Sequence, residues 1–256
     1  SSLLAVSIGI VFLFGFFWET DARKHLFDRA KKMTGANFVM LLFIFMSSQI
    51  FATVFGTGVE WGLNQFGYSV LNDIKSASST SETISMLLYS AIAAPVTEEL
   101  IFRGFVMRGL EKIGKWYAII ISAFLFGAFH GNFVQGAYAF IAALALGYIA
   151  MEYSIYWSIL LHVMNNFVFG DLFSYLTDGL SDQTQTVLSY SMEGIFLVGT
   201  LIVLIIKRKK LAQSLRELHM TKEKWIGTVT AAALIIFLLI QFYFGMSGVE
   251  PLKLEG

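Results

Sequence analysis

The sequence predicts an all-α membrane protein, a polytopic bundle of about eight transmembrane helices. Hydrophobic residues make up 56% of its 256 residues and charged residues only 14%, whereas soluble domains carry about 25% charged residues. The mean hydropathy is +0.68, and the apolar residues fall in runs long enough to cross a bilayer. The absence of cysteine excludes disulfides, thiolate catalysis and cysteine-bound metal. The zero net charge gives no indication of a nucleic-acid partner, so we expect the lipid bilayer to be the main environment.

Eight apolar runs predict the spans, at residues 3–18, 36–58, 83–101, 116–131, 134–151, 154–170, 187–206 and 225–246. The first run lacks a small-residue cleavage pattern, which indicates a spanning helix rather than a signal peptide. Lysine and arginine concentrate in the first, third and seventh connections, and the third holds Arg103, Arg108, Lys112 and Lys115. These connections share one side of an eight-span bundle, which the positive-inside rule makes cytoplasmic, with both termini outside. We expect residues 73–82, rich in Ser and Thr, to form an exposed loop.

We expect residues 1–256 to form a single membrane-embedded domain, because no internal repeat and no soluble segment interrupts the apolar runs. Pro95 lacks a backbone donor, so the third span should kink or restart just before Glu98. Small residues at every fourth position predict close helix packing on the fourth and fifth spans: Ala123, Gly127 and Gly131 on one, Ala139, Ala143 and Gly147 on the other.

Two adjacent carboxylates and one arginine interrupt the apolar third span. Glu99 and Arg103 are four residues apart, so they share a helical face and can form an ion pair. Glu98 is offset from Glu99 by about 100° on such a helix. Charges at bilayer depth are costly and are usually paired and functional. The pattern therefore predicts one neutralised glutamate and one available for chemistry, although an interfacial charge cluster would have the same spacing.

Two of the four histidines, His130 and His162, lie inside apolar runs. His162 and Asn166 are four residues apart and share a helical face, and Phe126 can pack beside His130 in the same way. Glu98 and His130 both lie about 16 residues from the turn at residues 113–115, hence about 24 Å up the same hairpin. We expect His162 at the same depth if its own turn lies deeper in the membrane. His25 and His219 occur in charged connections and are expected at the surface.

These polar groups are suited to hydrolysis. A desolvated glutamate can act as a general base on water, and imidazole or amide groups can stabilise an oxyanion. Glu98, His130 and His162 also form a possible zinc ligand set with an open position for water. No His-Glu-x-x-His, Gly-x-Ser-x-Gly or Ser-Lys pattern is present, so the familiar zinc-protease and serine-protease arrangements are not predicted.

The ordered motifs Glu98-Glu99-x-x-x-Arg103, Phe126-x-x-x-His130 and His162-x-x-x-Asn166 resemble those of the CPBP family. These are the CAAX proteases and bacteriocin-processing enzymes, intramembrane proteases also called the Abi family. The resemblance covers about residues 83–170, the expected catalytic core. Residues 1–82 and 171–256 would supply flanking transmembrane helices.

The resemblance implies an endopeptidase with Glu98 activating the attacking water and Glu99, held by Arg103, either supporting the site or assisting proton transfer. His130 would position the water, and His162 and Asn166 would stabilise the oxyanion. Both a zinc mechanism, with His130, His162 and Glu98 as ligands, and a metal-free mechanism fit these residues. We favour the metal-free one because asparagine is a poor zinc ligand.

The resemblance also indicates the substrate and the setting. The substrate would be a peptide or protein that enters from the membrane or its cytoplasmic face. Eukaryotic members cleave prenylated CAAX termini, whereas bacterial members are linked to bacteriocin immunity and to leader-peptide processing. We expect a multi-pass protein of a bacterial cytoplasmic membrane. Two other functions are compatible with the sequence: a non-catalytic scaffold or immunity and signalling partner, and a transporter with a Glu/His proton relay. The transporter would need inverted repeats, which the sequence lacks.

Overall fold

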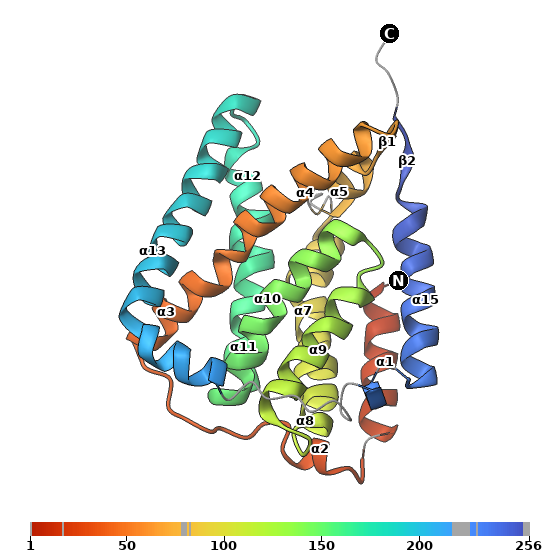
Figure 1. The fold of residues 1–256 in the computed structure, drawn as a ribbon, viewed down its shortest axis with the longest axis vertical. Helices are drawn as coiled ribbons and strands as arrows, with labels where there is room; N and C mark the ends of the chain where they lie inside the picture. The colour runs from red at the N-terminus through yellow and green to blue at the C-terminus, as the bar shows by residue number, and fades with distance from the viewer. Residues whose placement is uncertain are drawn as a thin grey trace.

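The computed structural model describes residues 2–16, 18–77, 81, 83–216, 226–228 and 230–252. Long helices packed side by side form the molecule (Figure 1), as the all-α prediction expects. A short antiparallel ladder pairs β1 (Tyr68–Ser69) with β2 (Glu250–Pro251). This ladder joins the end of α4 to the chain that follows α15, so two segments distant in sequence meet at one end of the bundle.

The first part of the chain contains α1 (Ser2–Phe16), α2 (Asp21–Lys24), α3 (Gly35–Met46), α4 (Ser48–Asn64) and α5 (Leu71–Ala77). The central part begins with α6 (Ile84–Leu88), η1 (Tyr89–Ala93), α7 (Ala94–Glu99), η2 (Leu100–Val106) and α8 (Met107–Leu110). It continues with α9 (Lys115–Phe129), α10 (Phe133–Glu152), α11 (Ile155–Met164), η3 (Asn165–Leu172) and α12 (Phe173–Thr177). The last helices are α13 (Asp182–Arg216) and α15 (Ala232–Ser247).

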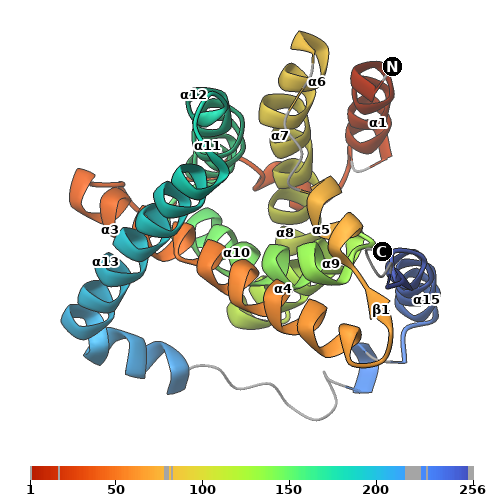
Figure 2. The same cartoon turned by 90° about the horizontal axis from the view of Figure 1, so that it is seen from above.

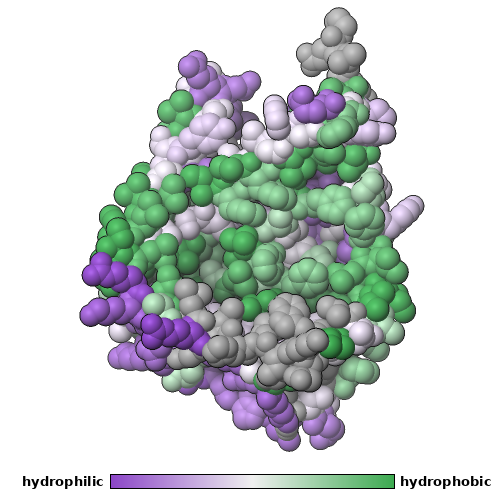
Figure 3. Space-filling view, in the orientation of Figure 1, coloured by the Kyte–Doolittle hydropathy of each residue, from purple (hydrophilic) through white to green (hydrophobic). Residues whose placement is uncertain are grey.

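Within the described residues, five helical stretches are long and apolar enough to cross a membrane: Gly35–Asn64, Ile84–Leu110, Phe133–Glu152, Ile155–Thr177 and Asp182–Ser214. Three shorter apolar helices are Ser7–Phe16, Lys115–Phe129 and Ala232–Ser247. These eight helical stretches lie at the eight positions predicted from hydropathy. Figure 3 shows apolar side chains across the middle of one face and hydrophilic ones towards its ends, the surface expected of a membrane-spanning bundle.

The third span is one continuous rod of alternating helix type. α7 lies between two π-helical segments, η1 and η2, in which each turn is wider than an α-helical turn. Pro95 lies in the first turn of α7, where its missing N–H costs least. The kink or restart predicted just before Glu98 is seen only as a change from π-helix to α-helix at Ala94, because the chain stays helical through Pro95. π-helical turns are rare and often occur at functional sites. The two π-helical segments on either side of α7 therefore indicate that Glu98 and Glu99 belong to such a site.

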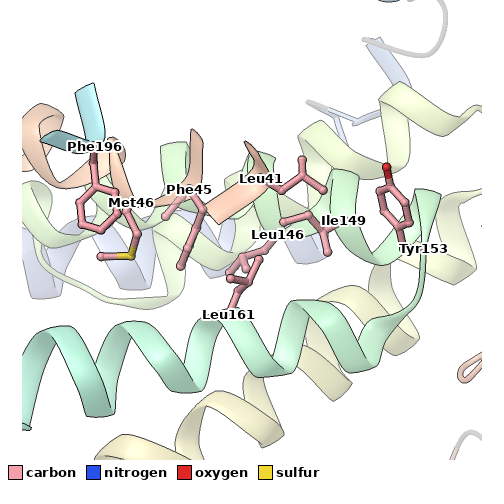
Figure 4. Close-up of a cluster of buried hydrophobic side chains, with 9 residues drawn as sticks. Leu41, Phe45, Met46, Leu146, Ile149, Tyr153, Leu161 and Phe196 are labelled. Atoms are coloured by element: carbon pink, nitrogen blue, oxygen red, sulfur yellow. The ribbon is translucent and has the colours of Figure 1, made fainter. Parts of the chain in front are cut away.

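The largest apolar core forms where α3, α10, α11 and α13 meet (Figure 4). Leu161 of α11 is fully buried there beside Leu146 and Phe45. Burying a side chain of this size contributes about 1.5–3 kcal/mol. His162 follows Leu161 directly, so the apolar contacts of α11 fix the position of the imidazole. Figure 2 shows α9 and α10 near the centre, with α13 and α15 on opposite sides.

The helices α9 and α10 form a tightly packed hairpin. A Cβ atom added to Gly127 would lie 2.6 Å from the carbonyl oxygen of Gly136, so only glycine allows the two backbones to approach this closely. The predicted close packing of the fourth and fifth spans is confirmed at these positions. Gly131, however, has a φ of +59° and forms the turn between the two helices rather than part of the packing stripe.

Two loop predictions were wrong. Arg103, which we counted with the basic third connection as well as with Glu99, is only 1% exposed and lies inside the bundle. Residues 73–77, expected in an exposed loop, belong to α5. Asp73 packs there against Gly248, and the amide of Asn132 donates to its carbonyl oxygen over 3.1 Å.

Candidate active site

A fully buried ion pair lies at the junction of α7 and η2. Arg103 Nη1 is 2.9 Å from Glu99 Oε1, and the two side chains are 1% and 0% exposed. The ion pair predicted from the four-residue spacing is therefore confirmed. A buried charge without its partner is strongly destabilising, so each of these residues holds the other in the bundle.

Two further groups approach Glu99 from α11. His162 Nδ1 is 2.9 Å from Glu99 Oε1, and the Ser158 hydroxyl donates to Glu99 Oε2. Ser158 is fully buried and lies one helical turn before His162. The motifs did not predict a role for Ser158, although its four-residue spacing from His162 places both on one helical face. With these contacts, both carboxylate oxygens of Glu99 have partners.

Glu98 differs from Glu99 in both exposure and contacts. Its side chain is 21% exposed, and Oε2 lies 3.7 Å from His162 Nε2. This separation is too long for a direct hydrogen bond. Among the described residues, no group donates a hydrogen bond to Glu98. Glu98 therefore keeps its capacity to accept hydrogen bonds, and its position beside His162 leaves it accessible.

Backbone and carboxylate acceptors orient both imidazoles. His130 Nδ1 is 2.8 Å from the carbonyl oxygen of Phe126, and His162 Nδ1 is 2.9 Å from Glu99. Because these partners only accept, each Nδ1 carries the hydrogen. In the neutral ring Nε2 then has a lone pair. On His162 this lone pair belongs to the nitrogen that lies nearest Glu98.

The Phe126 ring connects the charged and imidazole groups. The Arg103 guanidinium lies over it at 4.3 Å from the ring centre. The centre of the Phe126 ring lies 4.8 Å from the centre of the His130 ring and 5.9 Å from that of the His162 ring, and both contacts are edge-to-face. The predicted packing of Phe126 beside His130 is confirmed. Through this ring, η2, α9 and α11 bring Arg103, His130 and His162 around one point.

His130 lies at the very end of its helix, close to the end of the predicted span 116–131. We placed it inside the fourth span, but α9 ends at Phe129 and His130 caps its C-terminus. Gly131 then turns the chain towards α10. His130 nevertheless lies within electrostatic range of Glu98, His162 and Arg103, so the predicted convergence of the third, fourth and sixth spans holds for these groups.

Asn166 belongs to a neighbouring hydrogen-bond network. Its amide nitrogen donates to the carbonyl oxygen of Ser90 over 2.9 Å, and its oxygen accepts from Asn165. The Asn165 oxygen accepts from Gln49 over 2.8 Å and from the Tyr138 hydroxyl over 3.3 Å. Asn166 thus lies one turn beyond His162 without a direct contact to Glu98 or Glu99 among the described contacts. One N–H of its amide remains for another acceptor.

The side chains do not form a ready metal site. The candidate ligands Glu98, His130 and His162 have suitable chemistry for zinc. Within the part of the chain that the structure describes, however, no three His, Cys, Asp or Glu side chains are placed to hold one metal ion. The arrangement of these donors therefore does not fit a zinc centre as it stands.

A comparison with known protein families finds a match over the region that contains the candidate active site. Residues 80–168 match the family model described as type II CAAX prenyl endopeptidase Rce1-like. No curated protein and no solved structure gives a comparable match. The matched range contains Glu98, Glu99, Arg103, His130, His162 and Asn166. The resemblance found in the sequence is thus confirmed for residues 80–168, which match an Rce1-like model of the CPBP family and lie within a polytopic membrane bundle.

Proposed function

We propose that the protein is an intramembrane endopeptidase that hydrolyses a peptide bond of a membrane-associated peptide or protein with water activated by Glu98. The main support is the difference between the two adjacent glutamates. Glu99 is enclosed and held by Arg103, His162 and Ser158, whereas Glu98 is partly exposed and accepts no hydrogen bond from the described residues. Such a division separates a positioning carboxylate from a reactive one.

In the proposed first step, a water molecule lies against Glu98 and the histidines. Glu98 accepts one hydrogen of this water, and the His130 Nε2 lone pair accepts the other and fixes its orientation. The water oxygen attacks the peptide carbonyl carbon as its proton passes to Glu98. A tetrahedral oxyanion forms, and the free N–H of Asn166 can stabilise it. His162 can do so in its cationic form, in which Nε2 has taken up a second proton from solvent before the substrate binds.

In the second step the tetrahedral intermediate collapses. The carbon–nitrogen bond breaks, the carbonyl forms again, and Glu98 returns its proton to the leaving amine. The products are a carboxylic acid and an amine, and Glu98 is again ionised. Glu99 acts in neither step: it orients His162 through Nδ1, while Arg103 balances its charge. Apart from the water and the peptide substrate, every group used in these steps is a side chain of the protein.

A comparison of peptides from cells that contain the wild type or Glu98→Gln tests this proposal. Glutamine keeps the size of the side chain but cannot accept the proton. We expect a set of cleavage products to be lost with Glu98→Gln while the protein accumulates normally. Unchanged products would favour the non-catalytic scaffold instead. Glu193→Gln is a matched control, because Glu193 lies in the membrane helix α13 and accepts a hydrogen bond from Thr53.

A further inference from the structure

A cavity of about 560 Å³ lies beside His130, at the junction of α5, α15, β2 and the turn between α9 and α10. We call it the His130 cavity. Its polar walls are formed by Asn72, Asp73, Ser76, Gln241, Ser247 and Glu250. His130 lines the cavity, and its ring packs against Phe126, which also contacts His162 beside Glu98. The imidazole is therefore the point at which the cavity meets the candidate active site.

Specific contacts hold the walls of the His130 cavity in place. Asn132, the N-cap of α10, donates to the carbonyl oxygen of Asp73 over 3.1 Å and so anchors α5. Asn72 donates to Glu250 over 3.0 Å, next to the paired strands β1 and β2. A Cβ atom on Gly131 would lie 3.1 Å from Phe244. The cavity is thus bounded by packed and hydrogen-bonded elements.

The two ends of the bundle differ in charge. Residues 19–34, 107–115 and 207–216 carry thirteen lysines and arginines, and Figure 1 places α2, α8 and the end of α13 at its lower end. Ion pairs from Lys31 and Lys115 to Glu152 also join two of these segments there. The described connections at the other end, 65–77, 178–181 and 248–252, carry only Lys75 as a basic residue. The positive-inside rule makes the basic end cytoplasmic.

The His130 cavity lies at the poorly basic end, near β1 and β2 (Figure 1). We propose that this cavity is the entrance through which water and a peptide segment reach Glu98 from the non-cytoplasmic side of the membrane. The inference rests on the proposed endopeptidase function and assigns its substrates to exported or translocated polypeptides. It differs from the entry through the membrane or its cytoplasmic face that we expected from the sequence.

The polar lining supports this role. Hydrolysis inside a membrane requires a continuous supply of water, and a cavity remains hydrated only if several polar groups line it. The carboxylates of Asp73 and Glu250 and the amides of Asn72 and Gln241 supply such groups. A peptide backbone that enters the cavity also finds donors and acceptors for its own N–H and C=O groups, which cannot be left unpaired in the bilayer.

The chain contains no cysteine, which allows a direct test with single-cysteine variants of the full-length protein. Ser247→Cys places a thiol in the His130 cavity, and Lys209→Cys places one on an exposed position at the basic end. Intact cells are treated with a bulky, charged, membrane-impermeant maleimide, before and after permeabilisation. We expect Ser247→Cys to react in intact cells and Lys209→Cys only after permeabilisation. Ser76→Cys is the alternative cavity variant if Ser247→Cys does not accumulate.

The same cells show whether the cavity is the route to the site. External modification of Ser247→Cys should remove the cleavage products that are lost with Glu98→Gln, whereas treated wild-type cells should keep them. If both cavity thiols are protected in intact cells, the inference is overturned. It is also overturned if the cleavage products persist after complete modification of the thiol. Neither result affects the proposed function. If the labelling pattern is as expected but Glu98→Gln loses no products, the proposed function itself fails.

Discussion

Glu99 and Arg103 form a 2.9 Å ion pair in which neither side chain reaches the surface of the bundle. The guanidinium also lies 4.3 Å above the Phe126 ring. Its geometry towards Glu99 gives no well-aligned hydrogen bond, so the interaction is mainly between the charges and between Arg103 and the ring. This pair keeps a full negative charge next to His162 without making Glu99 available to a substrate.

Removal of one member of the pair should unfold the site. We expect Arg103→Leu to destabilise the protein by about 3–5 kcal/mol, because it leaves the Glu99 charge buried without compensation. The double variant Glu99→Leu/Arg103→Leu should recover part of this loss. Thermal unfolding in detergent measures both effects. A single variant as stable as the wild type would show that the pair does not support the bundle.

The reactive glutamate should behave differently. We expect Glu98→Gln to lower the cleavage rate by about 10²–10⁴-fold, the usual contribution of a general base. Its thermal stability should stay close to that of the wild type, because Glu98 accepts no hydrogen bond from the described residues. The rate is measured on purified protein with a peptide identified from cells. A rate within a few-fold of the wild type would exclude Glu98 as the base.

Ser158 should be a positioning residue that acts through Glu99 and His162. We expect Ser158→Ala to cost about 1–3 kcal/mol of stability, since the Glu99 carboxylate loses one of its donors. It should also lower kcat more than it raises KM, because the imidazole loses its fixed orientation. Ser122→Ala is the matched control: Ser122 is equally buried but donates to the carbonyl oxygen of Phe102. Equal effects of the two variants on kcat would contradict this role.

Chelation should distinguish the metal-free mechanism from the zinc mechanism. We expect the cleavage rate to survive dialysis against a strong chelator, because the described side chains do not form a three-ligand metal site. Metal analysis of the same sample by mass spectrometry gives the occupancy. Activity that is lost on chelation and restored by Zn²⁺ would establish a metal-dependent reaction instead, with Glu98, His130 and His162 as the candidate ligands.

Asp73 should make the stability of the fold depend on pH. Partial burial, and then repulsion from Glu250, raises the pKa of Asp73 above its usual 3.8. Because the folded state favours the protonated form, stability is lost as the pH rises through 3.8 and the higher folded pKa. We expect Asp73→Asn to be more stable than the wild type at neutral pH and equally stable below pH 3.8. Melting temperatures measured across this range check the difference.

The sequence allowed the prediction of those features that depend on periodicity. Apolar run length located the eight helices, and four-residue spacing identified the Glu99–Arg103 pair and the packing of Phe126 on His130. The six candidate site residues were identified from their motifs, and the expected proximity of Glu98 and His130 needed only the hairpin geometry of α9 with the third span.

Other features depend on local backbone geometry and on long-range contacts. Glycine at position 131 has a positive φ and ends α9 early, so His130 lies at a turn. A small-residue stripe does not distinguish such a turn from a packed helix. Ser158, Gln49 and Tyr138 were missed because their roles come from contacts with distant helices, such as the bond from Gln49 to Asn165, 116 positions away.

The π-helical segments that flank α7 have a consequence for how this site could arise or be lost. Each wide turn is equivalent to one extra residue inserted in an α-helix. Deleting a single residue from Leu100–Val106 would restore an ordinary turn and rotate everything beyond it by about 100°. The side chains beyond the deletion would then face different neighbours from those they contact now, although every side chain of the motif could still be present. Changes in chain length within this rod should therefore be more damaging than most substitutions, and an insertion of one residue could have created the arrangement from a simple membrane anchor.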